Sequence, residues 1–111
     1  MQNFVGAFFC ALLLLASAPA RADGDIVAGR QAAQKCEACH GLDGKAKIPE
    51  APNLAGQSSQ YLIAQLNAFR SGERKNEMMS LVAPTLEDKE IENLAAYYSA
   101  IEVTIGKIPG Q

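Results

Sequence analysis

Five consecutive residues, Cys36-Glu37-Ala38-Cys39-His40, constrain the fold and chemistry of this chain more than any other part of its sequence. Cys-x-x-Cys-His is the attachment sequence for covalently bound c-type haem. In that chemistry, two thiols on one helical turn add to the two vinyl groups of haem, and the next imidazole lies against the iron. The motif therefore predicts Cys36 and Cys39 as haem thioethers and His40 as the proximal iron ligand.

Two other uses of a Cys-x-x-Cys sequence have to be weighed, a redox dithiol and a metal site. A structural zinc site takes four Cys or His ligands, but outside the motif the chain offers only Cys10 and no second histidine. A thioredoxin-like dithiol belongs in a βαβ context, and no segment here alternates with period two. Both alternatives are therefore weaker than haem attachment.

The N-terminus has the pattern of a secretory signal peptide. An apolar run spans residues 4–16 and is followed by the small-residue cleavage pattern Ala20-Arg21-Ala22, although the first three residues carry no Lys or Arg. The run is shorter than the roughly 17 to 25 apolar residues that a membrane span needs. We therefore expect residues 1–22 to be removed on export to the periplasm, with a buried helix of the folded domain as the alternative interpretation.

The mature chain would then be a single domain of residues 23–111 that retains two of the three cysteines, because Cys10 leaves with the signal. An oxidising compartment does not favour two free thiols, and covalent haem would occupy both. A domain this small also buries a marginal core and usually gains stability from a cofactor or another cross-link.

The charge of the chain argues against one class of partner. The whole chain has a formal net charge of −2, and loss of Arg21 with the signal makes the mature protein one unit more negative. Because nucleic-acid binding relies on neutralising phosphates with a basic surface, we do not expect DNA or RNA as a partner.

The hydrophobic pattern predicts an all-α domain. We expect a first helix over 26–40, a loop over 41–56, a second helix over 58–72, a last helix over 85–101 and an irregular tail over 102–111. No repeat or interdomain linker interrupts this order.

Local signals mark the ends of the two later helices. Ser58 or Ser59 would cap the second helix, and Gly72 would end it. The sequence Thr85-Leu86-Glu87-Asp88 resembles a capping box that opens the last helix. The apolar positions of that helix available for burial are Leu86, Ile91, Leu94, Ala95 and Tyr98.

Methionine is the candidate for the sixth position of the iron. A thioether is a soft, neutral ligand that raises the reduction potential of haem iron. Met78 and Met79 are the only methionines after the signal, and both lie between the second and last helices. Either could instead be a packing residue of the core.

The chain resembles the class I c-type cytochromes, and is similar to the small bacterial monohaem members and to single domains of the bacterial dihaem members. The resemblance covers about residues 25–101. It is carried by the order and spacing of five pieces: CEACHGLDG, APNLAGQ, YLIAQLNAFRSGER, the Met pair and LEDKEIENLAAYYS.

The resemblance implies further roles for individual residues. The Pro52 carbonyl would accept a hydrogen bond from the proximal imidazole, and Leu54 would pack on the haem. Gly29 and Tyr97 would form the contact where the first and last helices cross. The family spacing before the last helix selects Met79 as the distal ligand, with Met78 as the alternative.

The resemblance also implies a fold and a function. The fold would be a compact cytochrome c fold of three main helices and short helical turns around one covalent haem c. The function would be soluble one-electron transfer with transient redox partners and no catalysis, and no oligomer is implied. Two alternatives remain: a haem subunit held in a complex with a dehydrogenase or oxidase, and a peroxidatic or gas-binding haem protein. The single histidine, already assigned to iron, argues against the last.

Overall fold

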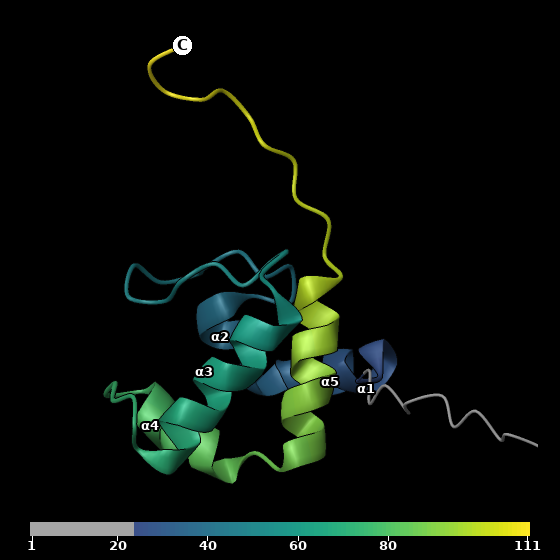
Figure 1. The fold of residues 1–111 in the computed structure, drawn as a ribbon, viewed down its shortest axis with the longest axis vertical. Helices are drawn as coiled ribbons and strands as arrows, with labels where there is room; N and C mark the ends of the chain where they lie inside the picture. Colours follow the sequence, from purple (N-terminus) through teal and green to yellow (C-terminus); the bar gives the residue numbers. More distant parts are fainter. Residues whose placement is uncertain (1–23) are drawn as a thin grey trace, which may run out of the picture.

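The computed structural model describes residues 24–111. Helices and connecting loops make up all of this part of the chain. The predicted signal peptide, residues 1–22, lies outside this part. The all-α prediction is confirmed (Figure 1). In chain order the segments are α1 (Ile26–Ala32), the 3₁₀ turn η1 (Ala33–Lys35), α2 (Glu37–His40), α3 (Ser59–Ser71), α4 (Met79–Val82), the 3₁₀ turn η2 (Ala83–Thr85) and α5 (Asp88–Ser99). Within residues 24–111, no helix has the length and apolar character needed to cross a membrane.

The first predicted helix is divided into three short pieces. Asp25 caps α1 by accepting hydrogen bonds from the backbone N–H groups of Val27 and Ala28, at 2.8 and 3.1 Å. After α1 the chain tightens, because the Cys36 N–H bonds to the Ala33 carbonyl three residues back. The Cys-x-x-Cys-His motif consequently starts a new turn, α2, in place of the continuous helix that the sequence predicted.

Helix α3 has the ends that its sequence predicts. Ser58 is the cap, and its hydroxyl accepts a hydrogen bond from the Tyr61 N–H at 3.4 Å. Gly72 ends the helix in the left-handed conformation, with φ of 83°. Leu62 and Phe69 are the buried residues of α3.

Helix α5 starts later than predicted, because its capping box is formed by Glu87 and Glu90. The predicted cap, Thr85, lies in η2 and donates its hydroxyl proton to the Val82 carbonyl, 2.7 Å away. Pro84 beside it supports the 3₁₀ turn, and the chain becomes extended at Leu86 before α5 begins. The five apolar positions predicted for burial, Leu86, Ile91, Leu94, Ala95 and Tyr98, are all buried.

Helices α1 and α5 cross in direct contact and join the two ends of the folded part (Figure 1). A Cβ on Gly29 would collide with the Asn93 carbonyl and would lie 2.8 Å from the Tyr97 Cβ. The Asn93 side chain, itself buried, accepts a hydrogen bond from the Asp25 N–H at 2.7 Å. The close Gly29–Tyr97 packing implied by the family resemblance is therefore present.

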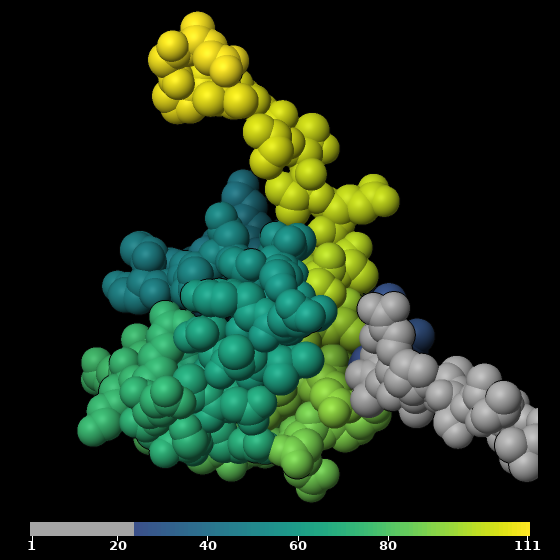
Figure 2. Space-filling view, viewed as in Figure 1, coloured from purple at the N-terminus to yellow at the C-terminus, as the bar shows by residue number. Residues whose placement is uncertain are grey.

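Residues 102–111 form neither helix nor strand and extend away from the helices. In the space-filling view this tail stands clear of the rest of the molecule (Figure 2). Near its start, Val103 contacts the region of Gly56. The site described next therefore depends on residues 24–101.

Candidate cofactor site

A predominantly apolar cavity of about 430 Å³ lies between the motif, helix α3, the methionine segment and helix α5. Its volume is in the range typical of cofactor and ligand pockets. Its walls include both motif cysteines, the single histidine and both candidate methionines: Cys36, Cys39, His40, Met78 and Met79. Residues about forty positions apart in the sequence thus face one space.

His40 ends helix α2 and is 7% exposed. Its Nδ1 lies 2.9 Å from the Pro52 carbonyl oxygen. Because a carbonyl oxygen can only accept, Nδ1 carries the proton and Nε2 keeps a free lone pair. The hydrogen bond that the family resemblance implied is present, and it prepares Nε2 for a metal ion.

Cys36 and Cys39 are half-buried and free of any disulfide. Burial raises the pKa of the Cys36 thiol, and this effect outweighs the lowering by Tyr98 and Lys35. Redox-active cysteines usually have a lowered pKa, because the thiolate is the nucleophile. The environment of Cys36 therefore does not support a dithiol oxidoreductase.

The two methionines differ in exposure. Met79, the first residue of α4, is half-buried, whereas Met78 is 54% exposed. The backbone N–H groups of both donate to the Asn76 side-chain oxygen, each at 3.0 Å, which fixes the start of α4. The greater burial of Met79 favours it as the residue that faces the cavity interior.

Pro52 and Leu54 also line the cavity. Leu54 is half-buried against the hydrophobic core, and its N–H donates to the Gly44 carbonyl at 2.8 Å. The loop that carries Pro52 is therefore tied to the turn that follows His40. This tie holds the Pro52 carbonyl in place beside the imidazole.

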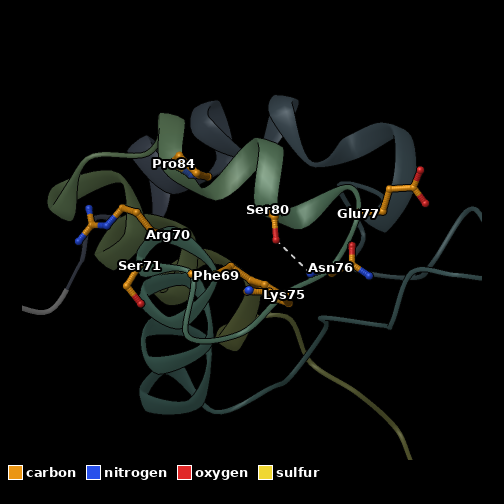
Figure 3. A pocket seen from close by; sticks show the side chains of 9 residues that line it. Phe69, Arg70, Ser71, Lys75, Asn76, Glu77, Ser80 and Pro84 are labelled. Carbon is orange, nitrogen blue, oxygen red and sulfur yellow. Dashed lines mark hydrogen bonds between the residues drawn. The ribbon is translucent and has the colours of Figure 1, made fainter.

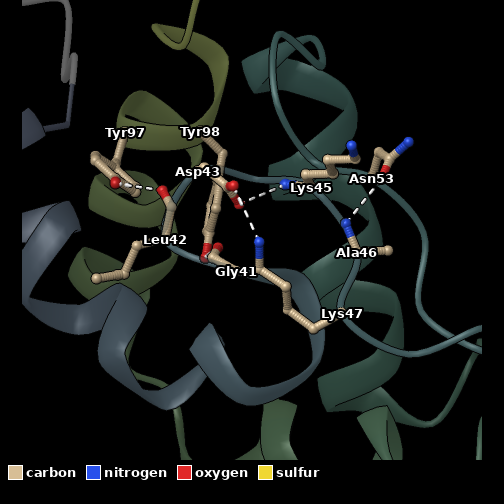
Figure 4. A network of polar contacts seen from close by, with 9 residues as sticks. All are labelled: Gly41, Leu42, Asp43, Lys45, Ala46, Lys47, Asn53, Tyr97 and Tyr98. Atoms are coloured by element: carbon tan, nitrogen blue, oxygen red, sulfur yellow. Dashed lines mark hydrogen bonds and ion pairs between the residues drawn. The ribbon is translucent and has the colours of Figure 1, made fainter.

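A polar network holds the backbone after His40 (Figure 4). The Tyr98 hydroxyl donates to the Gly41 carbonyl at 3.0 Å, and the Tyr97 hydroxyl donates to the Leu42 carbonyl at 2.5 Å. Asp43 accepts from Lys47 at 3.0 Å. The sequence analysis did not predict these tyrosine contacts; the available signal was that a buried tyrosine usually needs a partner for its hydroxyl.

A second depression, wide and open to solvent, lies beside the methionine segment (Figure 3). The view shows Ser80 of α4 pointing toward Asn76, whose N–H donates to the Ser80 hydroxyl at 3.0 Å. The residues that line this depression include Arg70 and Lys75 but no Cys, His or Met. It therefore lacks the groups that hold haem.

The residues around the 430 Å³ cavity fit a covalent haem c. They supply two thiols, an imidazole with a free Nε2, a thioether and an apolar wall. Across residues 24–111, no group of three or more His, Cys, Asp or Glu side chains could hold a metal ion. A zinc site is therefore not supported in this part of the chain.

Comparison with known proteins agrees with these features. The cytochrome c family model matches residues 26–101. Cytochrome c-554(548) of Halomonas halodenitrificans is 44% identical over 82 residues, which cover 71% of this chain and 99% of that protein. Cytochrome c4 of Pseudomonas aeruginosa is 37% identical over 87 residues, covering 78% of this chain and 43% of the relative. The thiosulfate dehydrogenase electron acceptor of Stutzerimonas stutzeri is 44% identical over 70 residues, covering 60% of this chain and 32% of that protein.

Solved structures share the fold. Reduced cytochrome c4 from Pseudomonas stutzeri has a TM-score of 0.68 and 36% identity, over 75% of this chain and 48% of that one. Thiosulfate dehydrogenase from Marichromatium purpuratum has a TM-score of 0.66 and 38% identity, over 75% of this chain and 20% of that one. The chain spans less than half the length of these two proteins and of two of the three sequence relatives. The chain belongs to the cytochrome c family, and is an electron-transfer protein with one covalently bound haem c.

Proposed function

We propose that the mature chain is a soluble periplasmic one-electron carrier. Cys36 and Cys39 would form the thioether bonds to haem, and His40 and Met79 would hold its iron. The observation that carries this proposal is the shared cavity in which the hydrogen bond to Pro52 leaves the His40 Nε2 free.

The protein's own residues prepare the iron site for electron transfer. The bound haem would supply the one-electron chemistry of its iron. The Pro52 carbonyl holds the His40 ring in one orientation and one tautomer, so a change of oxidation state requires little rearrangement of this ligand. The neutral Met79 thioether favours ferrous iron, and the apolar wall, to which Leu54 contributes, excludes water.

The signal-like N-terminus supports export, and hence the periplasmic location. A carrier that exchanges electrons with several proteins has to bind each of them weakly and through a small interface. We therefore propose that the partners of this domain are redox proteins that bind it transiently.

We assign no catalytic reaction to this domain. His40, assigned to iron, is the only histidine of the chain, so no second imidazole can serve as a distal acid or base. A peroxidatic or gas-binding role would also require an open sixth position, and we assign that position to Met79, a half-buried residue of the cavity wall.

Optical spectra of the purified, haem-loaded protein test this proposal. In the oxidised wild type we expect the weak long-wavelength charge-transfer band of an iron–methionine sulfur bond. Met79→Ala should abolish this band, whereas the matched variant Met78→Ala should retain it. Loss of the band only in Met78→Ala would reassign the ligand. A high-spin wild type that binds carbon monoxide would overturn the carrier proposal.

A second candidate function is a haem subunit held within a larger redox enzyme. The likeness to one part of the Marichromatium purpuratum thiosulfate dehydrogenase favours it. Purification from the native cell distinguishes the two functions. A free carrier elutes at the mass of one domain, whereas a subunit co-purifies with a dehydrogenase or oxidase at fixed stoichiometry.

A further inference from the structure

Helix α5 presents two consecutive tyrosines to the two residues that directly follow the iron ligand. The Tyr98 hydroxyl donates to the Gly41 carbonyl at 3.0 Å, and the Tyr97 hydroxyl donates to the next carbonyl, that of Leu42, at 2.5 Å (Figure 4). The two rings pack edge to face, with centroids 5.0 Å apart. One helix therefore holds the backbone on the C-terminal side of His40 at two successive points.

Gly41 is the point at which the backbone leaves helix α2. Its φ is +73°, a conformation that other residues rarely adopt, and an added Cβ would meet the Asp43 side chain and the Lys47 side chain. The Gly41 N–H donates to the Glu37 carbonyl at 2.9 Å. Because the N–H is held from one side and the carbonyl by Tyr98 from the other, the backbone directly after His40 has a fixed orientation.

The two tyrosines differ in their relation to the cavity. Tyr98 is 2% exposed, lines the cavity and lies close enough to Cys36 to affect its thiol. Tyr97 is half-buried at the α1–α5 crossing and is not part of the cavity wall. Tyr97 therefore makes the same type of hydrogen bond one residue further from the ligand, without contact with the site.

We infer that Tyr98 is a positioning residue for His40, which acts through the Gly41 carbonyl to set the orientation of the imidazole and thereby the reduction potential. This inference rests on the proposed role of His40 as iron ligand. The Pro52 carbonyl holds the ring at Nδ1, and Tyr98 holds the backbone from which the ring projects. With both contacts in place the imidazole has little freedom to rotate.

The test compares Tyr98→Phe with Tyr97→Phe in the haem-loaded protein. Each variant removes one hydroxyl and keeps the ring, so each loses one tyrosine–carbonyl hydrogen bond. At a fixed applied potential, Tyr98→Phe should change the ratio of ferric to ferrous protein by about twofold to tenfold, the range that one hydrogen bond of ordinary net strength can supply. Tyr97→Phe should leave this ratio within the error of the titration.

A spectroscopic measurement separates positioning from general stability. The NMR shifts of the haem methyl groups in the ferric protein depend on the orientation of the axial ligands, and we expect their pattern to change in Tyr98→Phe alone. Both variants should be less stable to denaturant. If Tyr98→Phe loses stability but keeps the wild-type potential and methyl shifts, the inference is wrong. The inference is also wrong if Tyr97→Phe changes the potential and the methyl shifts by as much as Tyr98→Phe does.

A wild-type measurement covers the case in which Tyr98→Phe yields too little protein. In the ferrous protein, the Tyr98 hydroxyl proton should exchange slowly with water and show a nuclear Overhauser effect to Gly41. A hydroxyl proton that exchanges too fast to observe would overturn the inference. These outcomes are separable from the proposed function, because failure of the latter would appear as missing haem or a high-spin wild-type spectrum.

Discussion

At the scale of single residues, Gly29 shows how one missing side chain permits a contact between distant parts of the chain. The backbone of α1 approaches that of α5 so closely that a Cβ at residue 29 would collide with the Asn93 carbonyl. An exposed helical glycine costs about 1 kcal/mol relative to alanine. The α1–α5 contact therefore requires a residue that helix propensity alone disfavours.

We expect Gly29→Ala to destabilise the holoprotein by about 1 to 3 kcal/mol, the usual cost of overfilling a packed contact, despite the gain in helix propensity. Denaturant unfolding measures the effect. Gly106→Ala is the matched control, because no atom lies within 4 Å of the Cβ position there, and its stability should stay within about 0.5 kcal/mol of the wild type. A Gly29→Ala protein as stable as the wild type would contradict the described crossing.

The roles of single residues could be predicted from the sequence to different extents. The motif itself specifies Cys36, Cys39 and His40, because the chemistry of haem attachment requires their spacing. The Gly29 contact and the Pro52 carbonyl followed from the family resemblance. The partner of the Tyr98 hydroxyl could not be predicted, because it depends on how residues 57 positions apart meet in three dimensions.

At the scale of elements, the N-terminus of α5 combines a cap with an ion pair to another segment. The Glu90 side chain accepts the Glu87 N–H at 3.1 Å and pairs with Lys35 of η1 at 2.7 Å. Lys35 and the Glu87 N–H together lower the pKa of the Glu90 carboxyl from its ordinary value of 4.5. Because this pKa is lower in the folded state, the contribution to stability is present above pH 4.5 and is lost as the pH falls further.

We expect Glu90→Gln to be less stable than the wild type at neutral pH by up to about 1 kcal/mol, the range for a partly exposed ion pair. The glutamine oxygen can still accept the Glu87 N–H, so the variant mainly removes charge. The stability difference should shrink as the pH falls below 4.5. Urea unfolding between neutral and acidic pH measures it. Glu92→Gln, whose partner Lys89 lies on the same helix, is the control and should have a smaller effect. A difference that grows in acid would contradict this assignment.

The existence of the main helices was easier to predict than their ends. The helical spacing of apolar positions identified α5 and its buried face correctly, because burial follows directly from hydrophobic spacing. The prediction of Thr85 as the cap was wrong because the sequence offers two possible N-caps, Thr85 and Glu87, two residues apart. The 3₁₀ turn around Pro84 includes Thr85, so α5 begins after Glu87. The break in the first helix also has no strong sequence signal, since Ala33 and Gln34 fit a helix as well as a 3₁₀ turn.

At the scale of the whole molecule, the 430 Å³ cavity lies where a domain of this size would otherwise have its core. Of the buried hydrophobic cluster, Leu62, Leu94, Ala95 and Tyr98 line that space. A small domain buries too little apolar surface to tolerate an unfilled cavity of this size. The cofactor is therefore part of the fold as well as the electron-transfer centre.

We expect the double variant Cys36→Ser/Cys39→Ser to carry no covalent haem and to lose cooperative unfolding, because serine cannot form the thioether bonds. Haem staining after denaturing electrophoresis measures covalent attachment. Circular dichroism measures the helix content, and binding of a hydrophobic dye measures the apolar surface that the chain exposes. Met78→Ala, which retains both thiols, should keep covalent haem and native helix content. A double variant that unfolds cooperatively at the wild-type midpoint would show that the fold does not need its cofactor.

The contact between α1 and α5, made at Gly29, Asn93 and Asp25, has a consequence for the order in which the site forms. The Asp25–Asn93 hydrogen bond spans 68 positions, and the Tyr98–Gly41 bond spans 57. The cysteine motif precedes α5 in the chain, so in a chain that emerges N-terminus first the segment that attaches haem appears before the helix that closes the site. Closure comes only with the last helix, which joins the start of the domain and holds the backbone beside the iron ligand. A chain truncated within α5 would therefore present its cysteines but could not enclose what they had bound.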